Sequence, residues 1–239
     1  MINIFDDDIK KLKAYIAKND AKVYAYDESK ALPTSEHSSL ILTKDSAYEL
    51  GGSDMPCAVA TVLTDGLPVV NQTLVIGKEL KDIKHDCNYA KIVLISVKDA
   101  SDDEQAIFDL TKSLEYAKYK ENVEGFMMRA SVIKQREQVR VSKTALKQGL
   151  SFESLGATTI KSYLSRDVVN AVTVLFVADT AADFSPLQDF ASHTSKILSA
   201  FNHILDNVLV DCAHCNLKEI CDKVEGMREL HFSLSKPRY

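Results

Sequence analysis

The order of apolar and polar residues predicts one helix and then a series of strands in the N-terminal part of the chain. Residues 7–18 repeat apolar side chains at helical spacing, and Asp6 can cap this amphipathic helix, which we expect to pack as an appendage. Short apolar runs follow, separated by turn residues such as the Gly51-Gly52 pair. The predicted strands are residues 23–26, 40–43, 58–63, 73–76 and 90–97.

The second half of the chain alternates helices and strands. Ser101 and Glu104 form a capping box before a helix that reaches about residue 120, and Ser142 starts a short helix that Gly149 can end. The β-branched run 168–178 predicts a central strand, because its continuity is typical of burial on both faces. The remaining predictions are strands at 126–133 and 138–141, and helices at 152–164 and 185–208.

These segments together predict an α+β fold, with a mixed or largely antiparallel sheet covered by helices and a short C-terminal Cys-rich tail. We expect three parts. Residues 1–40 form an N-terminal helix and extension, residues 41–184 form the α+β domain, and residues 185–239 form a long helix with a Cys/His tail that binds a metal or a cluster.

The charge of the chain argues against several classes of partner. The formal net charge is −5 and the pI is about 5.7, with acidic and basic residues interspersed, so no basic footprint for nucleic acid exists. The longest apolar runs are too short to span a bilayer. The acidic N-terminus lacks the features of a secretory signal. We therefore expect a cytoplasmic protein with neither a nucleic-acid nor a membrane partner.

Three cysteines near the C-terminus form the pattern C-x2-C-x5-C. Cys212, Cys215 and Cys221 can converge on one centre, because a C-x2-C turn places both of its sulfurs on the same side. Cytosolic thiols stay reduced, which favours metal binding over disulfides. His231 is the candidate fourth ligand by its spacing. Such a set suits zinc or an iron-sulfur cluster, and the ligands alone do not choose between them.

Other residues offer alternatives for this fourth position. His214, Cys57 and Cys87 are the further candidates. The inserts between the three tail cysteines are too polar for simple core packing, which argues against idle thiols there. Cys57 and Cys87 each stand alone beside strand-like sequence, so we expect them to be packed thiols.

An ordered series of short motifs resembles the β subunit of the carbon monoxide dehydrogenase/acetyl-CoA synthase complex. The order and approximate spacing of that family's middle, α+β domain hold from about residue 44 to 180. The matching segments are Tyr48–Gly52 (E-L-G-G), Thr73–Leu80 (V-I-G-x-x-L), Glu124–Phe126 (E-G-F), Gln135-Arg136 (Q-R), Val139–Lys143 (V-R-V-S-K) and Phe152–Gly156.

This resemblance implies an iron-sulfur cluster in the tail. In the family, the middle domain is followed by a domain that carries a [4Fe-4S] cubane bridged to nickel, with cubane ligands spaced C-x2-C-x8-C-x9-C. Cys212, Cys215 and Cys221 resemble the first three ligands with a shortened loop, and His231 falls at the position of the fourth. The family's later Cys-Gly-Cys, which holds the distal nickel, has no counterpart in these 239 residues. We therefore expect a role in anaerobic metabolism as an electron-transfer or accessory protein, with partners from such a complex, rather than complete acetyl-CoA synthesis.

The family's middle domain is also implicated in binding coenzyme A or partner proteins. The matching basic residues are Arg136, Arg140 and Lys143, and guanidinium groups suit phosphates through bidentate hydrogen bonds. The alternative interpretation is a solvated, charged edge of a strand and helix.

Three functional hypotheses follow, in order of preference. The first is an iron-sulfur relative of the β subunit, in which a neutral histidine ligand raises the cluster's reduction potential. The second is a zinc-stabilised binding or scaffold protein without enzymatic activity. The third is an active synthase subunit that borrows missing ligands from a partner chain.

Overall fold

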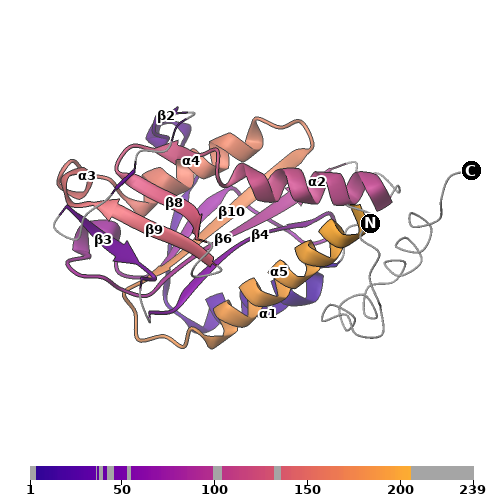
Figure 1. The fold of residues 1–239 in the computed structure, drawn as a ribbon, viewed down its shortest axis with the longest axis horizontal. Helices are drawn as coiled ribbons and strands as arrows, with labels where there is room; N and C mark the ends of the chain where they lie inside the picture. Colours follow the sequence, from indigo (N-terminus) through magenta and orange to yellow (C-terminus); the bar gives the residue numbers. More distant parts are fainter. Residues whose placement is uncertain are drawn as a thin grey trace, which may run out of the picture. The chain divides into compact units, whose positions relative to one another are not determined.

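Figure 1 shows the fold of the protein as a computed structural model. The chain divides into two compact units, Met1–Phe190 and Ala191–Tyr239. Helix α5 (Ser185–Leu205) crosses the boundary between them. The structure describes residues 4–35, 37, 40–41, 46–52, 55–98, 104–131 and 136–205.

Sheet A is a mixed sheet of five strands in the order β1-β5-β10-β6-β4. The pairs β5/β10 and β4/β6 are parallel, whereas β1/β5 and β6/β10 are antiparallel. The predicted mixed sheet and the central place of the 168–178 run are thereby confirmed. The strands are β1 Ala21–Ala25, β4 Cys57–Thr64, β5 Gln72–Gly77, β6 Tyr89–Val97 and β10 Val169–Ala178.

The composition of the inner strands follows from burial on both faces. Every residue of β6 is buried, and in β10 only Asn170 is exposed. A strand covered on both faces has no water-facing side to supply polar residues, so its sequence is a continuous apolar run rather than an alternation. Lys91 is the charged exception within β6.

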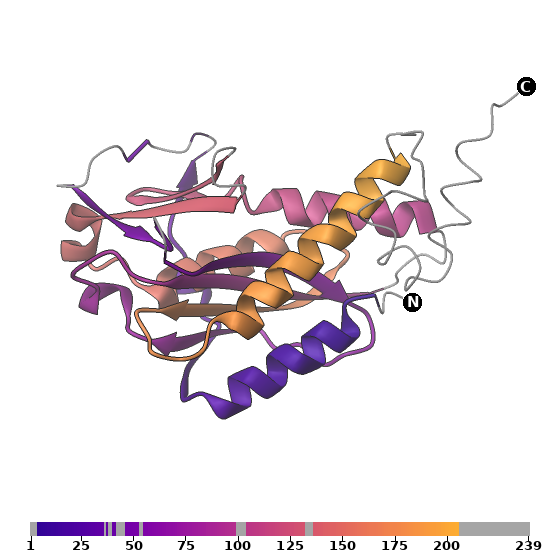
Figure 2. The same ribbon diagram turned by 60° about the horizontal axis from the view of Figure 1, so that its bottom comes forward.

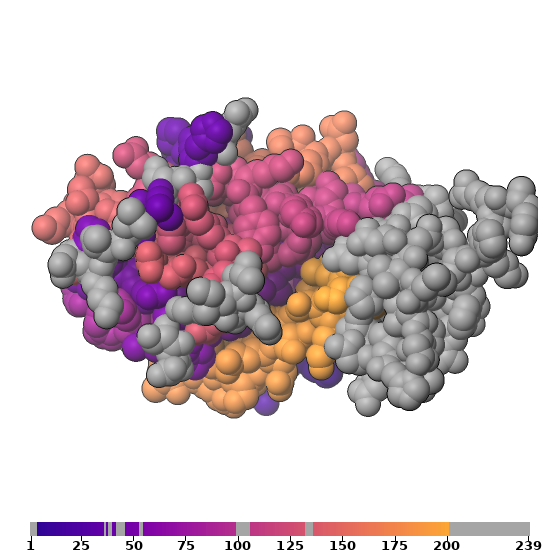
Figure 3. Space-filling model, viewed as in Figure 1, coloured from indigo at the N-terminus to yellow at the C-terminus, as the bar shows by residue number. Residues whose placement is uncertain are grey.

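Sheet B is wholly antiparallel and has the order β2-β7-β8-β9-β3. Its long pair, β8 and β9, was predicted as strands from residues 126 and 138 onward, and Figure 3 shows these two strands at the surface on the viewed face. Of the predicted strand at 40–43, the described residues Leu40 and Ile41 lie outside any strand. The strands are β2 Thr34–Ser35, β3 Ala47–Leu50, β7 Asn122–Val123, β8 Phe126–Ser131 and β9 Arg136–Ser142.

Sheet B and two helices cover the same face of sheet A. Helix α4 (Phe152–Leu164) packs on β5 and β10, and helix α2 (Glu104–Ala117) packs against β4. Figure 2 shows sheet B and α2 above sheet A, with helix α1 (Asp6–Lys18) on the other side. The predicted α+β class, a sheet covered by helices, is confirmed.

The N-terminal helix is held more closely than an appendage would be. Its apolar side chains Phe5, Ile9 and Leu12 are buried. The prediction that Asp6 caps this helix is wrong. Asp6 is the first helical residue, and its carboxylate accepts a hydrogen bond from the Thr64 hydroxyl at 2.8 Å. The spacing of apolar residues predicted the helix, but it gave no information on the contact between Asp6 and Thr64.

Caps define the helices that follow β9. The Ser142 hydroxyl accepts from the backbone N–H groups of Thr144 and Ala145, so the predicted start of helix α3 (Lys143–Lys147) is confirmed. Helix α4 begins after a capping box made by Ser151 and Ser154 and has the predicted bounds. The predicted cap Ser101 lies outside the described residues.

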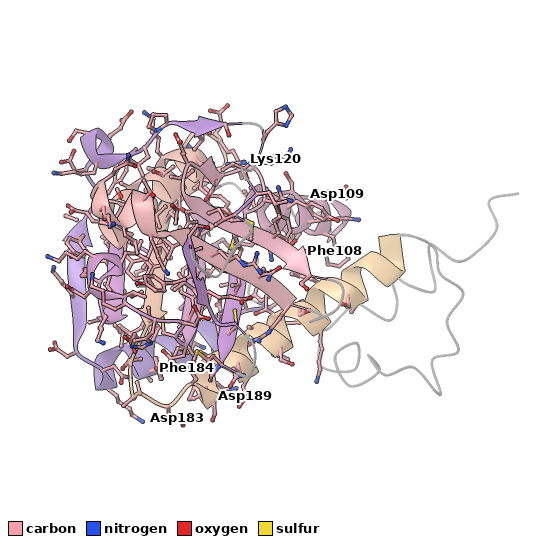
Figure 4. The ribbon with its side chains drawn as sticks, turned by 60° about the vertical axis from the view of Figure 1, so that its left-hand side comes forward. Phe108, Asp109, Lys120, Asp183, Phe184 and Asp189 are labelled. Atoms are coloured by element: carbon pink, nitrogen blue, oxygen red, sulfur yellow. The ribbon has the colours of Figure 1, made fainter. Side chains whose placement is uncertain are left out.

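The turn after β10 leads into the last described helix. The Asp183 carboxylate accepts a hydrogen bond from the Ser185 backbone N–H at 2.9 Å, and the Phe184 side chain is buried. Figure 4 labels both residues at this turn. Asp183 therefore satisfies one of the backbone donors that the start of an α-helix leaves without an intrahelical partner.

An aromatic cluster packs α4 onto sheet A. The rings of Phe152 and Phe176 are stacked with centroids 4.6 Å apart, and Tyr89 lies 6.4 Å and 6.5 Å from them. All three side chains are fully buried. Such pairs add about 0.5–1.5 kcal/mol beyond the apolar area they bury.

Candidate functional site

The three predicted basic residues lie on sheet B and at its exit into α3. Arg136 and Arg140 occupy alternate positions of β9 and share one face, whereas the fully buried Val139 and Val141 occupy the other face. Lys143 is the first residue of α3. The backbones of the two arginines lie roughly 13 Å apart, four residue steps along an extended strand.

Each of these side chains already has a contact within the fold. Arg136 Nη1 donates to the Met55 carbonyl at 3.0 Å, and Arg140 Nη1 donates to the Ile41 carbonyl at 2.8 Å. The Lys143 ammonium lies 4.8 Å from the centroid of the Tyr48 ring. These contacts hold neighbouring loops and strand β3 against β9. A guanidinium carries five N–H donors, and each of the two hydrogen bonds named here uses one of them.

The E-L-G-G motif forms β3 and the turn that follows it. The Gly51 N–H donates to the Cys87 carbonyl at 2.7 Å, and Gly51 has a φ of +68°. A Cβ at Gly51 would lie 2.7 Å from Cys57 Sγ, which leaves no room for a side chain. The Glu49 carboxylate accepts from the Gln138 side chain at 3.0 Å. The motif thus joins sheet B to the two cysteines.

Cys57 and Cys87 both belong to the first compact unit, and neither forms a disulfide with another described residue. Cys87 is buried, and burial raises the pKa of its thiol to about 12. It is therefore protonated at neutral pH and is a poor nucleophile. Cys57 is partly exposed. Cys57 pairs in register with Tyr89 between β4 and β6, and the burial of Cys87 agrees with the packed thiol that the sequence predicted there.

No group of three or more His, Cys, Asp or Glu side chains suited to a metal ion occurs in the part of the chain that the structure describes. The predicted ligands Cys212, Cys215, Cys221 and His231, and the alternative His214, lie outside the described residues. The assignment of these ligands therefore stays a prediction.

A buried charged network between the two sheets was not predicted from the sequence. Lys91 Nζ lies 3.4 Å from Glu121 Oε2 and donates to the Thr159 hydroxyl at 3.1 Å. Thr159 in turn donates to Glu121 Oε2 at 2.9 Å. Burial raises the pKa of Glu121, and the Lys91 ammonium partly offsets this rise. The one signal in the sequence was a lysine inside the apolar run 90–97.

A second buried lysine lies close to this pair. Lys118 Nζ contacts Glu137 Oε1 at 2.7 Å and also pairs with Glu115. Burial alone would lower the pKa of Lys118, but the two carboxylates outweigh it and raise the pKa. The Tyr119 hydroxyl donates to Glu137 at 3.2 Å. Lys118 thus remains a fixed cation at neutral pH and cannot act as a nucleophilic amine.

Comparison with known proteins identifies the scaffold. A family model described as "CO dehydrogenase/acetyl-CoA synthase complex beta subunit" matches residues 37–182, more than half of the chain. A search of curated proteins found no match. None of the described helices is long and apolar enough to cross a membrane. The matched segment contains both glycine motifs and all three predicted basic residues, in the predicted order. The chain therefore belongs to the CO dehydrogenase/acetyl-CoA synthase complex beta subunit family.

Proposed function

We propose that this protein binds a [4Fe-4S] cluster through Cys212, Cys215, Cys221 and His231. Its role would be electron transfer or an accessory function in a complex of the CO dehydrogenase/acetyl-CoA synthase type, rather than full acetyl-CoA synthesis. The observation that carries the proposal is the C-x2-C-x5-C pattern placed shortly after a segment that matches the family. Three thiolates and a neutral imidazole are a chemically suitable donor set for such a cluster.

The chemistry of the other cysteines supports the choice of ligands. Cys87 is held as a buried, protonated thiol, and Cys57 packs against the turn at Gly51. A thiolate, not a thiol, ligates iron or zinc, so recruiting Cys87 would require deprotonation in a buried site. The tail cysteines are therefore the stronger candidates. A bound cluster would supply one-electron chemistry, and a histidine ligand would raise its reduction potential.

Metal analysis after anaerobic purification tests this proposal. We expect iron and sulfide in the protein, with a broad visible absorbance, and loss of both in Cys212→Ser, Cys215→Ser and Cys221→Ser. The control is Cys57→Ser, which removes a thiol from the matched domain and should keep the iron. Protein without iron or sulfide, both as purified and after anaerobic reconstitution, contradicts the proposal.

Two other outcomes correspond to the competing hypotheses. Stoichiometric zinc in a colourless protein supports a zinc-stabilised scaffold, which the same Cys3His donor set would suit. Nickel together with CO- and methyl-dependent acetyl-CoA formation, alone or with partner subunits, supports an active synthase. Replacing His231 by alanine shows whether the fourth ligand is needed, because a three-cysteine site should lose affinity for either metal centre.

We further propose that the Arg136, Arg140 and Lys143 side chains bind phosphate groups of coenzyme A. Coenzyme A carries a pyrophosphate and a separate 3′-phosphate, and three basic side chains on β9 and at the start of α3 suit a ligand with several anionic groups. Calorimetric titration with coenzyme A tests this. Arg140→Gln should weaken binding, whereas Lys161→Gln, which removes an exposed lysine on α4, should leave it unchanged. Equal affinity of both variants and the wild type would exclude the assignment.

A further inference from the structure

A small cavity lies between sheet A, sheet B and helix α4. Its volume is about 10 Å³, which is room for one water molecule. The apolar part of its lining includes Val123, Met128 and Phe176. Its polar part includes Lys91, Glu121 and Thr159. A cavity with polar groups of this kind can hold a bound molecule, whereas a purely apolar cavity of this size would stay empty.

One oxygen of Glu121 is left without a partner at this place. Glu121 Oε2 accepts hydrogen bonds from Lys91 and Thr159, and the Ser162 side chain also interacts with the carboxylate. Among the described residues, no donor meets hydrogen-bond geometry at the buried Oε1. The side chain is only 4% exposed. An unsatisfied buried acceptor carries an energetic cost, which is larger when the group is charged. A donor small enough for the cavity would remove that cost.

The charges and the size of the cavity favour a small neutral ligand. Lys91 pairs with Glu121, and Lys118 pairs with Glu115 and Glu137, so the excess negative charge disfavours an anion. Room for one water molecule is too little for a hydrated cation. The Lys91 ammonium has three donors, two of which are directed to Glu121 and Thr159. Its third donor is available to a molecule in the cavity.

We propose that one structural water molecule occupies this cavity, donating a hydrogen bond to Glu121 Oε1 and accepting one from Lys91. The water completes the hydrogen bonding of the buried pair. It thereby stabilises the charged form of a carboxylate that is buried between the two sheets. This site is independent of the proposed cluster in the tail, so either proposal can fail without the other.

A crystal structure and oxygen-17 relaxation dispersion of the full chain test the water site. We expect electron density within hydrogen-bond distance of Glu121 Oε1, about 2.5–3.0 Å away. Val123→Ile adds one methyl group to the cavity wall and should remove about one long-lived water per molecule from the dispersion profile. The matched control is Val23→Ile, because Val23 lies on the exposed edge strand β1 and should change nothing.

Two results would overturn the proposal. One is a well-ordered crystal structure with no density in the cavity beside Glu121. The other is a dispersion profile that Val123→Ile leaves unchanged although its crystal structure shows the cavity filled. Because Val123→Ile is a conservative change, retained circular dichroism will show that the variant has folded.

Discussion

Replacing either member of the Lys91–Glu121 pair should destabilise the protein far more than replacing both. The two side chains are 6% and 4% exposed, and their charged atoms are 3.4 Å apart. At that separation the attraction is about 5 kcal/mol for an effective dielectric constant of about 20. Withdrawing each ion from water costs several kcal/mol, so the intact pair contributes little net stability. Removing one partner leaves the other charge buried and uncompensated.

The expected losses of stability distinguish the attraction within the pair from the cost of burying each charge. Lys91→Met and Glu121→Leu should each lower the free energy of unfolding by about 3–5 kcal/mol. The double variant should come within about 1–2 kcal/mol of the wild type, the remaining loss arising mainly because Thr159 loses both of its hydrogen-bond partners. The exposed pair Lys161–Glu28 is the matched control. Its atoms are only 3.0 Å apart, yet its side chains are 56% and 66% exposed, so a corresponding cycle should give about 0–1 kcal/mol.

Urea unfolding followed by far-ultraviolet circular dichroism measures these differences, because the chain contains no tryptophan to serve as a fluorescent probe. The two single changes should be strongly non-additive. If they add within about 0.5 kcal/mol in the double variant, the side chains do not interact as a buried ion pair and the reasoning is wrong.

Three further predictions concern backbone geometry, thiols and pH. Gly77→Ala should lower the free energy of unfolding by more than Gly149→Ala does. Both residues have a positive φ, so each substitution carries a backbone cost of about 1–3 kcal/mol. Only at Gly77 would the new Cβ also clash, because it would lie 2.2 Å from a carbonyl oxygen. Iodoacetamide at pH 8 should alkylate native Cys57 before Cys87, as read by peptide mass spectrometry, since the Cys87 thiol is buried with a pKa of about 12; equal rates would contradict this. The contribution of Glu121 to the free energy of unfolding should fall as the pH rises above the ordinary glutamate pKa of 4.5. The reason is that the raised pKa lets the folded protein keep a proton that the unfolded chain has already released. Urea titrations across pH measure this component, and the double variant that lacks both charges should not show it.

Elements whose pattern reflects local spacing could be predicted from the sequence. Helix α4 has the predicted bounds, because its apolar residues repeat at helical spacing and a capping box at Ser151 fixes its start. The run at 168–178 was placed at the centre of a sheet because a strand buried on both faces needs no polar side. In both cases the decisive interactions lie within one segment.

Pairing between strands could not be predicted in the same way. Strand β10 is parallel to β5 and antiparallel to β6, although all three strands have similar apolar patterns. A pattern of period two fixes which side chains are buried but not the neighbour or its direction. The same holds for charges, since Lys91 meets Glu121 and Thr159 across separations of 30 and 68 residues. Until the partner is placed, such a lysine is only an exception in an apolar run.

The predicted basic residues illustrate the intermediate case. The positions of Arg140 on a strand and of Lys143 at a helix start follow from the sequence. Arg136 precedes the predicted strand 138–141, but β9 begins at this residue, so that Arg136 and Arg140 share a face. Their hydrogen bonds to Met55 and Ile41 depend on loops that are 81 and 99 residues away. Local sequence therefore located the side chains but gave no information on the contacts that hold them.

The motifs that identify the family mark backbone geometry rather than a reacting group. Gly51 permits close approach to Cys57, and Gly77 permits close approach to the end of β10. Both residues lie in the segment that matches the family model, whereas the predicted cluster ligands follow it. The stability of the matched domain and the binding of iron should then respond to different substitutions. Gly77→Ala should weaken the fold, and Cys215→Ser should abolish iron binding while the urea midpoint of the matched domain stays unchanged. If Cys215→Ser unfolds that domain as well, the cluster is part of the scaffold rather than a site added to it.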